Sequence, residues 1–149
     1  MRTVCAGILA ILLMSPGLAR AAENSQASKG VVLAFYKLAL GDKKPTEAFA
    51  RYAAEGFVEH SADSPTGTAQ STVAFLSGMI EKSPQAKWEI VRVIAEGDLV
   101  FLHVRFTPAP GAPPVIVGEI FRVHGGKLAE HWDIIQPSPE HPVNPNPII

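Results

Sequence analysis

The chain has 149 residues, of which 47% are hydrophobic and 18% are charged, and its 13 basic and 14 acidic residues give a formal net charge of −1. This composition can fill a hydrophobic core and excludes a disordered tail. The sequence has no basic run, which excludes a nucleic-acid-binding surface because such surfaces need positive charge against phosphates.

The first 21 residues have the pattern of a secretory signal peptide. Arg2 precedes the apolar run 4–14, and the small-x-small sequence Ala19-Arg20-Ala21 follows a Pro-Gly break. The apolar run is about half as long as a membrane-spanning helix. We therefore predict a signal peptide at 1–21, a periplasmic or secreted mature protein, and no membrane association after cleavage.

The remaining chain suits one domain, residues 22–136, followed by a tail at 137–149. Five prolines in the tail predict an extended arm that cannot join a β-ladder. Cys5 is the only cysteine and lies in the predicted signal peptide. The mature chain would therefore have no thiol for a disulfide, a zinc-thiolate site or a nucleophile.

Helical patterns occupy the first half of the domain. Apolar residues at helical spacing predict a first helix over 24–40. Pro45 begins a second helix, which ends near Gly56 and is followed by a brief extended piece at 57–60. Thr68 is a capping residue for a third helix, which ends at Ser83-Pro84.

The second half changes to an extended pattern rich in Val, Ile, Phe and Trp. It predicts four strands, at 87–95, 99–107, 115–124 and 127–136. Short connections, including a two-residue turn at Gly125-Gly126, make neighbouring strands antiparallel. Helices followed by strands in one small domain predict an α+β fold in which a curved sheet wraps the helices.

Three stretches carry a family resemblance. They are 56–60 (GFVEH), 96–100 (EGDLV), and 119–122 (EIFR) with its continuation at 126–137 (GKLAEHWDIIQP). Together they resemble the SnoaL-like family of the nuclear transport factor 2-like superfamily, over nearly all of the mature chain. The resemblance implies a cone in which three N-terminal helices pack in a curved four-stranded antiparallel sheet, with a pocket in its mouth and dimerisation through the sheet.

The resemblance leaves the chemistry open, because the relatives include polyketide cyclases, ketosteroid isomerases, epoxide hydrolases and modules without catalysis. Two departures bear on chemistry. The family often has His-Asn-Pro where this chain has His60-Ser61-Ala62, and Asp where it has Glu119. A longer carboxylate arm changes the position of an acid or base.

Asp133 is the first candidate for a catalytic residue, because the related hydrolases and cyclases place a carboxylate near this point of the last strand. An acid in an apolar pocket has a raised pKa that suits proton transfer. His131 shares a strand face with Asp133 and is a candidate for an oriented base. The alternative for both is a buried, hydrogen-bonded structural pair.

Glu119 and Trp132 are also candidates, but the two-residue turn would pair them with each other. They would then face away from His131 and Asp133, so that only one of the two sets lines the pocket unless a bulge shifts the register. The set that does not line the pocket would face a dimer partner or solvent.

The remaining candidates come from other parts of the chain. His60 is a candidate for contacting a ligand carbonyl or, alternatively, a surface residue that caps a turn. Tyr36, Trp88 and His103 are candidates for the pocket wall, although the alternation of strand 99–107 also allows His103 to face a partner subunit. The histidines lack metal-ligand spacing, so we predict neither metal nor cofactor.

Two functions remain open at this point. In the first, the chain is a cyclase- or isomerase-type enzyme: Asp133, assisted by His131, moves a proton of a small apolar molecule, and His60 or Glu119 stabilises the developing charge. In the second, the same cone binds an apolar ligand or forms a homodimer without catalysis.

Overall fold

The computed structural model describes residues 16–149 as three helical segments and one five-stranded sheet. Helix α1 (Pro16–Tyr36) continues into a π-helical turn, η1 (Lys37–Gly41), and is followed by α2 (Pro45–Tyr52) and α3 (Ala69–Lys82). The strands are β1 (Ala53–Glu59), β2 (Lys87–Glu96), β3 (Leu99–Thr107), β4 (Val115–His124) and β5 (Lys127–Pro137). The predicted signal peptide and Cys5 lie largely outside the described residues, so cleavage stays a prediction.

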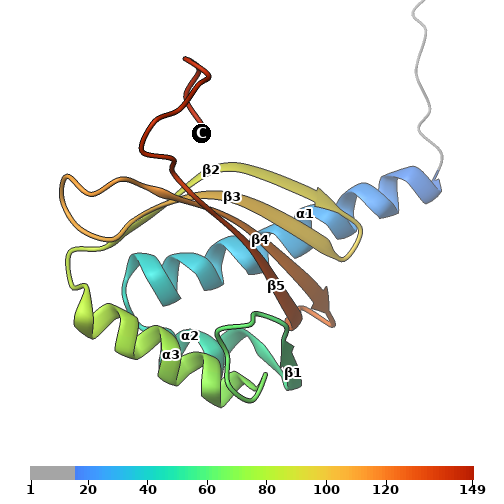
Figure 1. Cartoon of the computed structure of the whole chain (residues 1–149). Coiled ribbons are helices and arrows are strands. Elements are labelled where there is room, and N and C mark those ends of the chain that lie inside the picture. The colour runs from blue at the N-terminus through green and yellow to red at the C-terminus, as the bar shows by residue number, and fades with distance from the viewer. Residues whose placement is uncertain (1–15) are drawn as a thin grey trace, which may run out of the picture.

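The fold is the α+β cone expected from the sequence. The sheet has the order β1-β5-β4-β3-β2, and the three helices lie on its concave face, whereas the C-terminal tail leaves on the opposite side (Figure 1). Neighbours among β2, β3, β4 and β5 are antiparallel, as predicted. None of the helices within residues 16–149 has the length and apolarity needed to cross a membrane.

A fifth strand distinguishes the sheet from the expected one. The extended piece before the Pro/Gly turn begins at Ala53 and pairs in parallel with β5, which makes the sheet mixed. Strand β1 lacks a clear β pattern because Gly56 interrupts it with φ +78° and the register shifts between Ala53 and Val58. Its partner is more than sixty residues away, so sequence adjacency did not indicate the pairing.

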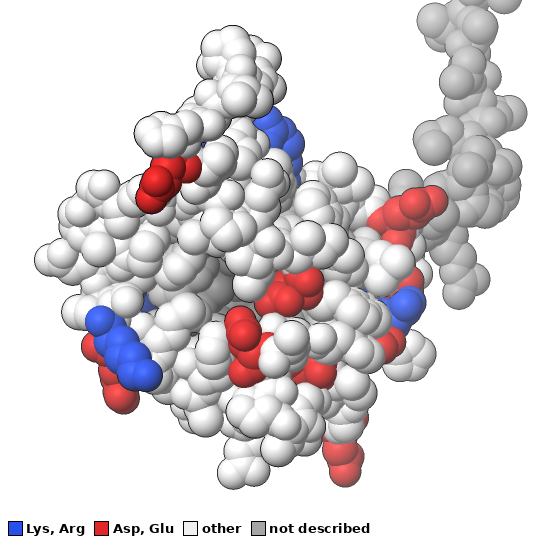
Figure 2. All heavy atoms as spheres, in the orientation of Figure 1, with Lys and Arg blue, Asp and Glu red and all other residues white. Residues whose placement is uncertain are grey.

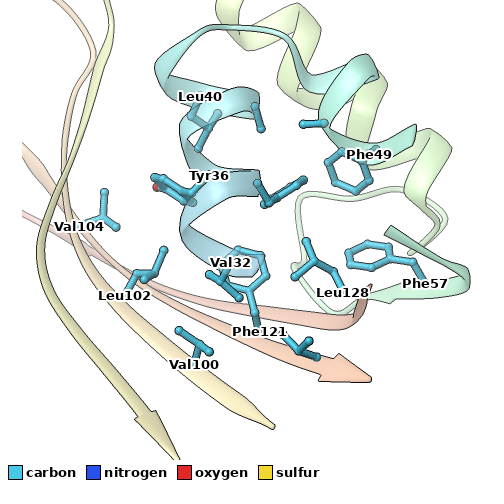
Figure 3. Packing of buried hydrophobic residues seen from close by; sticks show 14 residues of the cluster. Val32, Tyr36, Leu40, Phe49, Phe57, Val100, Leu102, Val104, Phe121 and Leu128 are labelled. Carbon is cyan, nitrogen blue, oxygen red and sulfur yellow. The ribbon is translucent and has the colours of Figure 1, made fainter. Parts of the chain in front are cut away.

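The hydrophobic core lies between α1 and the concave face. Val32, Tyr36 and Leu40 project from α1 and η1 towards Val100 and Leu102 of β3 (Figure 3). Phe35 makes edge-to-face contacts with both Phe49 and Phe121, at centroid distances of 5.1 and 5.8 Å. Such contacts add to the burial of the rings and fix α1 and α2 against the sheet.

Helix α3 begins at Ala69, directly after the capping residue Thr68 that the sequence predicted. The Thr68 hydroxyl accepts a hydrogen bond from the Ser71 amide, and the Ser71 hydroxyl accepts one from the Thr68 amide, which forms a capping box. Val58 also forms an isolated bridge with Thr68. The start of α3 is thereby held beside β1, and α3 closes one side of the cone.

Candidate functional site

A cavity of about 340 Å³ opens between α3 and the concave face of the sheet. Figure 2 shows a hollow on this face of the molecule, with acidic side chains beside it. Its apolar wall is formed by Phe35, Leu40, Phe49, Phe57, Phe75, Leu76, Met79, Trp88, Phe106, Val115, Val117, Phe121 and Ile135. Its polar lining is formed by Tyr36, Glu59, Ser61, Asp63, Ser64, Thr72, Glu119, His131 and Asp133. Within residues 16–149, no lysine or arginine lines this cavity.

A β-bulge in β5 brings the polar groups of the last two strands together. The pairing next to the Gly125-Gly126 turn is the expected one, with His124 opposite Lys127 and Val123 opposite Leu128. The next pair, however, is Arg122 with Glu130, so Ala129 is an extra residue in β5. Every later pair is therefore shifted by one residue.

The shifted register resolves the conflict between the two predicted sets of site residues. Glu119 pairs with Asp133 and Phe121 with His131, whereas Trp132 pairs with Ile120. Directly paired residues share a face of an antiparallel sheet. Glu119, His131 and Asp133 thus all line the cavity, and Trp132 faces the other way.

The His131 imidazole is held between two carboxylates. Its Nδ1 lies 2.7 Å from Oε1 of Glu59 on β1, and its Nε2 lies 2.7 Å from Oε2 of Glu119 on β4. The three side chains are 12%, 1% and 11% exposed, respectively. The Ser61 amide also donates a hydrogen bond to Glu59 Oε1, and Thr72 Oγ1 lies 3.4 Å from Glu59 Oε2.

This arrangement makes His131 an imidazolium. Burial alone would lower the pKa of His131, but the hydrogen bonds and negative charges of Glu119 and Glu59 raise it to about 10. Burial would likewise raise the pKa of Glu59, yet the bonds from His131, Ser61 and Thr72 outweigh it and lower that pKa. Both imidazole nitrogens donate protons to carboxylates, so His131 has no lone pair with which to act as a base.

Tyr36 extends this network into the helical layer. Its hydroxyl donates a 3.0 Å hydrogen bond to Glu119 Oε1. Burial, followed by the charge and the hydrogen bond of Glu119, raises the pKa of Tyr36 well above its usual value. Tyr36 directly precedes η1, where the Asp42 amide bonds to the Lys37 carbonyl at 2.7 Å. Such π-helical turns occur frequently at functional sites.

Asp133 lies next to the network but is not part of it. Its Oδ2 accepts a 2.8 Å hydrogen bond from the Ser61 hydroxyl, and no lysine, arginine or histidine among the described residues forms an ion pair with it. Burial raises the pKa of Asp133; the Ser61 bond acts against this, the charges of Glu119 and Glu59 add to it, and that of His131 opposes it. The half-buried carboxyl can therefore exchange a proton with a bound molecule.

Three of the predicted site residues lie outside the cavity. His60 stacks on Trp132 at a centroid distance of 4.5 Å, and its Nε2 lies 3.0 Å from Glu130 Oε2. His103 lies on the convex face of the sheet beside Arg92, with 3.0 Å between His103 Nδ1 and Arg92 Nη1. Strand alternation explains these positions, because His60 and Trp132 each neighbour a residue that faces inward. Tyr36 and Trp88 are among the residues that line the cavity.

Two residues of the site were not selected from the sequence. Glu59 lies in the extended piece predicted at 57–60, where it alternates with buried Phe57, and the residue as a whole is only 5% exposed. That alternation was an available signal for an inward-facing carboxylate. Ser61 was noted only as a departure from the family pattern, and nothing in the local sequence indicates its contact with Asp133, 72 residues away.

The described residues contain no group of three His, Cys, Asp or Glu side chains arranged to hold a metal ion. Both nitrogens of His131 are already occupied by Glu59 and Glu119. The arrangement therefore has the chemistry of a closed charge network beside the carboxyl group of Asp133, which is not part of that network.

Comparison with known proteins agrees with this architecture. The model of the SnoaL-like domain family matches residues 32–131. The chain therefore belongs to the SnoaL-like domain family. A search of curated proteins found no match.

Solved structures share the fold at low sequence identity. A protein assigned as a SnoaL-like polyketide cyclase from Jannaschia sp. CCS1 is 20% identical, with a TM-score of 0.63 over 82% of this chain and 89% of that one. A protein assigned as a ketosteroid isomerase from Kribbella flavida is 16% identical, with a TM-score of 0.61 over 85% and 90%. A nuclear transport factor 2-like protein of unknown function from Mesorhizobium loti is 19% identical, with a TM-score of 0.62 over 76% and 93%.

Proposed function

We propose that the protein binds a small apolar molecule in the cone and transfers a proton on it without a cofactor, with Asp133 as the acid/base group. The observation that carries this proposal is the position of Asp133. Its carboxyl lines an apolar cavity, has a raised pKa and has no counter-ion among the described residues. These properties suit a group that accepts and returns a proton near neutral pH.

The roles of the neighbouring residues follow from their contacts. His131 is a positioning residue rather than a base, because its two N–H groups are bound to Glu59 and Glu119. The negative charge of these two carboxylates exceeds the single positive charge of His131 and favours the protonated form of Asp133. Ser61 orients the Asp133 carboxyl through its hydroxyl.

A deuterium-exchange experiment tests proton transfer without knowledge of the natural substrate. Apolar carbon acids such as tetralone and benzoylacetone are incubated with the protein in heavy water, and mass spectrometry follows deuterium uptake beside the carbonyl. We expect the protein to accelerate uptake above the buffer rate, and Asp133→Asn to lose about a hundredfold or more of this acceleration, as is typical of an acid/base group. Equal rates for Asp133→Asn and wild type would refute the role of Asp133.

A binding module without catalysis is the second candidate. It is favoured by the closed Glu59–His131–Glu119 network, because the groups of this network are bound to one another and are not free to assist Asp133 in proton transfer. Native mass spectrometry of the purified protein would then detect a retained small molecule, while none of the carbon acids would show accelerated exchange. Accelerated exchange that depends on Asp133 would decide for the enzyme.

Homodimerisation and export complete the proposal. The convex face of the sheet carries Ile94 and Ile134, each 64% exposed, which would be covered by a partner. Light scattering should give twice the mass of the mature chain, and a monomer mass would contradict the dimer.

Fusion of residues 1–21 to a reporter that is active only after export should give signal, and a silent fusion would contradict the signal peptide.

A further inference from the structure

The cavity has an unusual balance of charge for a pocket with apolar walls. Four acidic residues line it, namely Glu59, Asp63, Glu119 and Asp133, and His131 is the only basic one. The positive charge of His131 is shared by Glu59 and Glu119, so these three groups together carry a net negative charge. Asp133 and Asp63 have no cation paired with them in the described part of the chain.

From this geometry we infer that the ligand of the cone is a hydrophobic amine, whose positively charged nitrogen binds Asp133 and whose apolar body fills the cavity. The inference rests on the proposed ligand-binding function and specifies the class of ligand. A carboxylate or phosphate ester would bring a further negative charge beside the acidic residues Asp133 and Glu119, which lie opposite each other on β5 and β4. Coulomb repulsion in a partly buried site disfavours such anions.

The free oxygen of Asp133 provides the binding group. Ser61 is the only hydrogen-bond donor to Asp133 among residues 16–149, and it binds Oδ2. Oδ1 therefore remains available to an N–H group of a ligand. An ammonium group placed there gains a charge-assisted hydrogen bond, and it supplies the counter-ion that the protein itself does not provide.

The wall of the cavity suits the rest of such a molecule. Trp88 and Phe106 stack at a centroid distance of 5.0 Å and both line the cavity. Aromatic faces bind apolar groups and also attract cations. The volume of about 340 Å³ lies near the lower end of the roughly 300–1,000 Å³ range of ligand pockets, which indicates a small ligand.

An amine at this position also fits the proposed proton transfer. Burial raises the pKa of Asp133, whereas a nearby positive charge favours its carboxylate form. Binding of the amine would thus hold Asp133 in the form that accepts a proton.

Three probes with the same apolar body test the inference. Phenylbutylamine, phenylbutanol and phenylbutyrate differ in charge but have similar length and volume. The chain has two tryptophans, and only Trp88 lines the cavity. The variant Trp132→Phe therefore makes the intrinsic fluorescence report on Trp88 alone, and each probe is titrated against it at near-neutral pH.

We expect the amine to bind about tenfold or more tightly than the alcohol, and the carboxylate to bind at least about tenfold more weakly than the alcohol. In the Trp132→Phe background, the further substitution Asp133→Asn should abolish the preference for the amine. Its affinity for the alcohol should stay within about twofold of that of the Trp132→Phe protein. Glu55→Gln removes one charge from an exposed position outside the cavity and should keep the preference.

The outcomes separate this inference from the proposed function. If the alcohol binds and the amine binds no better, the ligand is not an amine, although binding of apolar molecules in the cone stands. If the carboxylate binds best, the charge argument is wrong. If no probe changes the fluorescence of Trp88, both the inference and the proposed binding function are contradicted.

Discussion

Glu119 lies directly opposite Asp133 across the β4–β5 pair, although a regular two-residue hairpin would place Trp132 there. The extra residue Ala129 causes this difference. As a result, the two carboxyl groups share the concave face, where the charge of Glu119 contributes to the raised pKa of Asp133. The electrostatics of the site therefore depend on one backbone irregularity.

Replacement of Ser61 should change the acidity of Asp133. The Ser61 hydroxyl bonds to Asp133 Oδ2 and acts to lower the pKa of this carboxyl. We expect Ser61→Ala to raise the pKa of Asp133 further, because it removes the hydrogen bond that stabilises the carboxylate form. Carbon-detected NMR of the side-chain carboxyl measures this shift.

Ser61→Thr is the matched control, because it keeps the hydroxyl and should keep the pKa close to that of wild type. A pKa of Asp133 that is unchanged in Ser61→Ala, or that changes equally in both variants, would contradict the role of the hydroxyl.

The charge network around His131 should make stability depend on pH. Because the folded-state pKa of about 10 exceeds the ordinary value of 6.5, the folded protein holds the proton more tightly than the unfolded chain does. This contribution to the free energy of unfolding is fully present below pH 6.5, decreases as the pH rises, and is lost above about pH 10. It amounts to a few kcal/mol.

Urea denaturation at several pH values between 6.5 and 10 measures this loss. The variant His131→Gln has no proton to lose at this position, so its stability should vary much less over the same interval. Parallel pH profiles for variant and wild type would show that His131 is not held as an imidazolium.

Much of the fold could be predicted from the sequence, because local signals and element order agree. The capping residue Thr68 and the strand alternation around Val100 and Leu102 were readable without the structure. Strand β1 was not, because Gly56 breaks its pattern and its partner β5 is distant in the chain. Its pairing is a tertiary contact that overrides weak local preference.

The candidate site was also only partly predictable, because it depends on contacts between segments that are distant in the chain. Asp133, His131 and Glu119 were selected as ionisable residues in apolar strands, and the structure brings them to one cavity. Their proposed roles stay predictions, and the geometry assigns His131 to an ion network rather than to a free base. A bulge has no clear sequence signature at Ala129, so the register of the hairpin could not be derived.

Removal of the Tyr36 hydroxyl should destabilise the site without emptying the core. The hydroxyl donates to Glu119 Oε1, while the ring packs in the hydrophobic core. We expect Tyr36→Phe to lower the free energy of unfolding by about 1.5–3 kcal/mol, as for a hydrogen bond to a charged group. Urea denaturation measures the change.

Tyr52→Phe is the matched control, because Tyr52 is only partly buried and its hydroxyl has no hydrogen bond among the described residues. This variant should differ from wild type by less than about 0.5 kcal/mol. A Tyr36→Phe protein as stable as the control would show that the bond to Glu119 contributes nothing.

Deletion of Ala129 tests whether this residue is the extra one in the hairpin. Without it, regular pairing from the turn keeps Val123 opposite Leu128 and Arg122 opposite Glu130, so Glu119 stays opposite Asp133 on the concave face. His131 thus remains between Glu59 and Glu119. A register in which Glu59 lost this partner would be strongly destabilising, by about 3–5 kcal/mol.

We therefore expect the Ala129 deletion to fold, to melt close to wild type in circular dichroism, and to retain His131 as an imidazolium in proton NMR. Deletion of Asn144 in the exposed tail is the control for the loss of one residue and should leave the melting temperature unchanged. An Ala129 deletion that unfolded, or that lost the imidazolium of His131, would contradict the assignment of Ala129 as the one extra residue that sets this register.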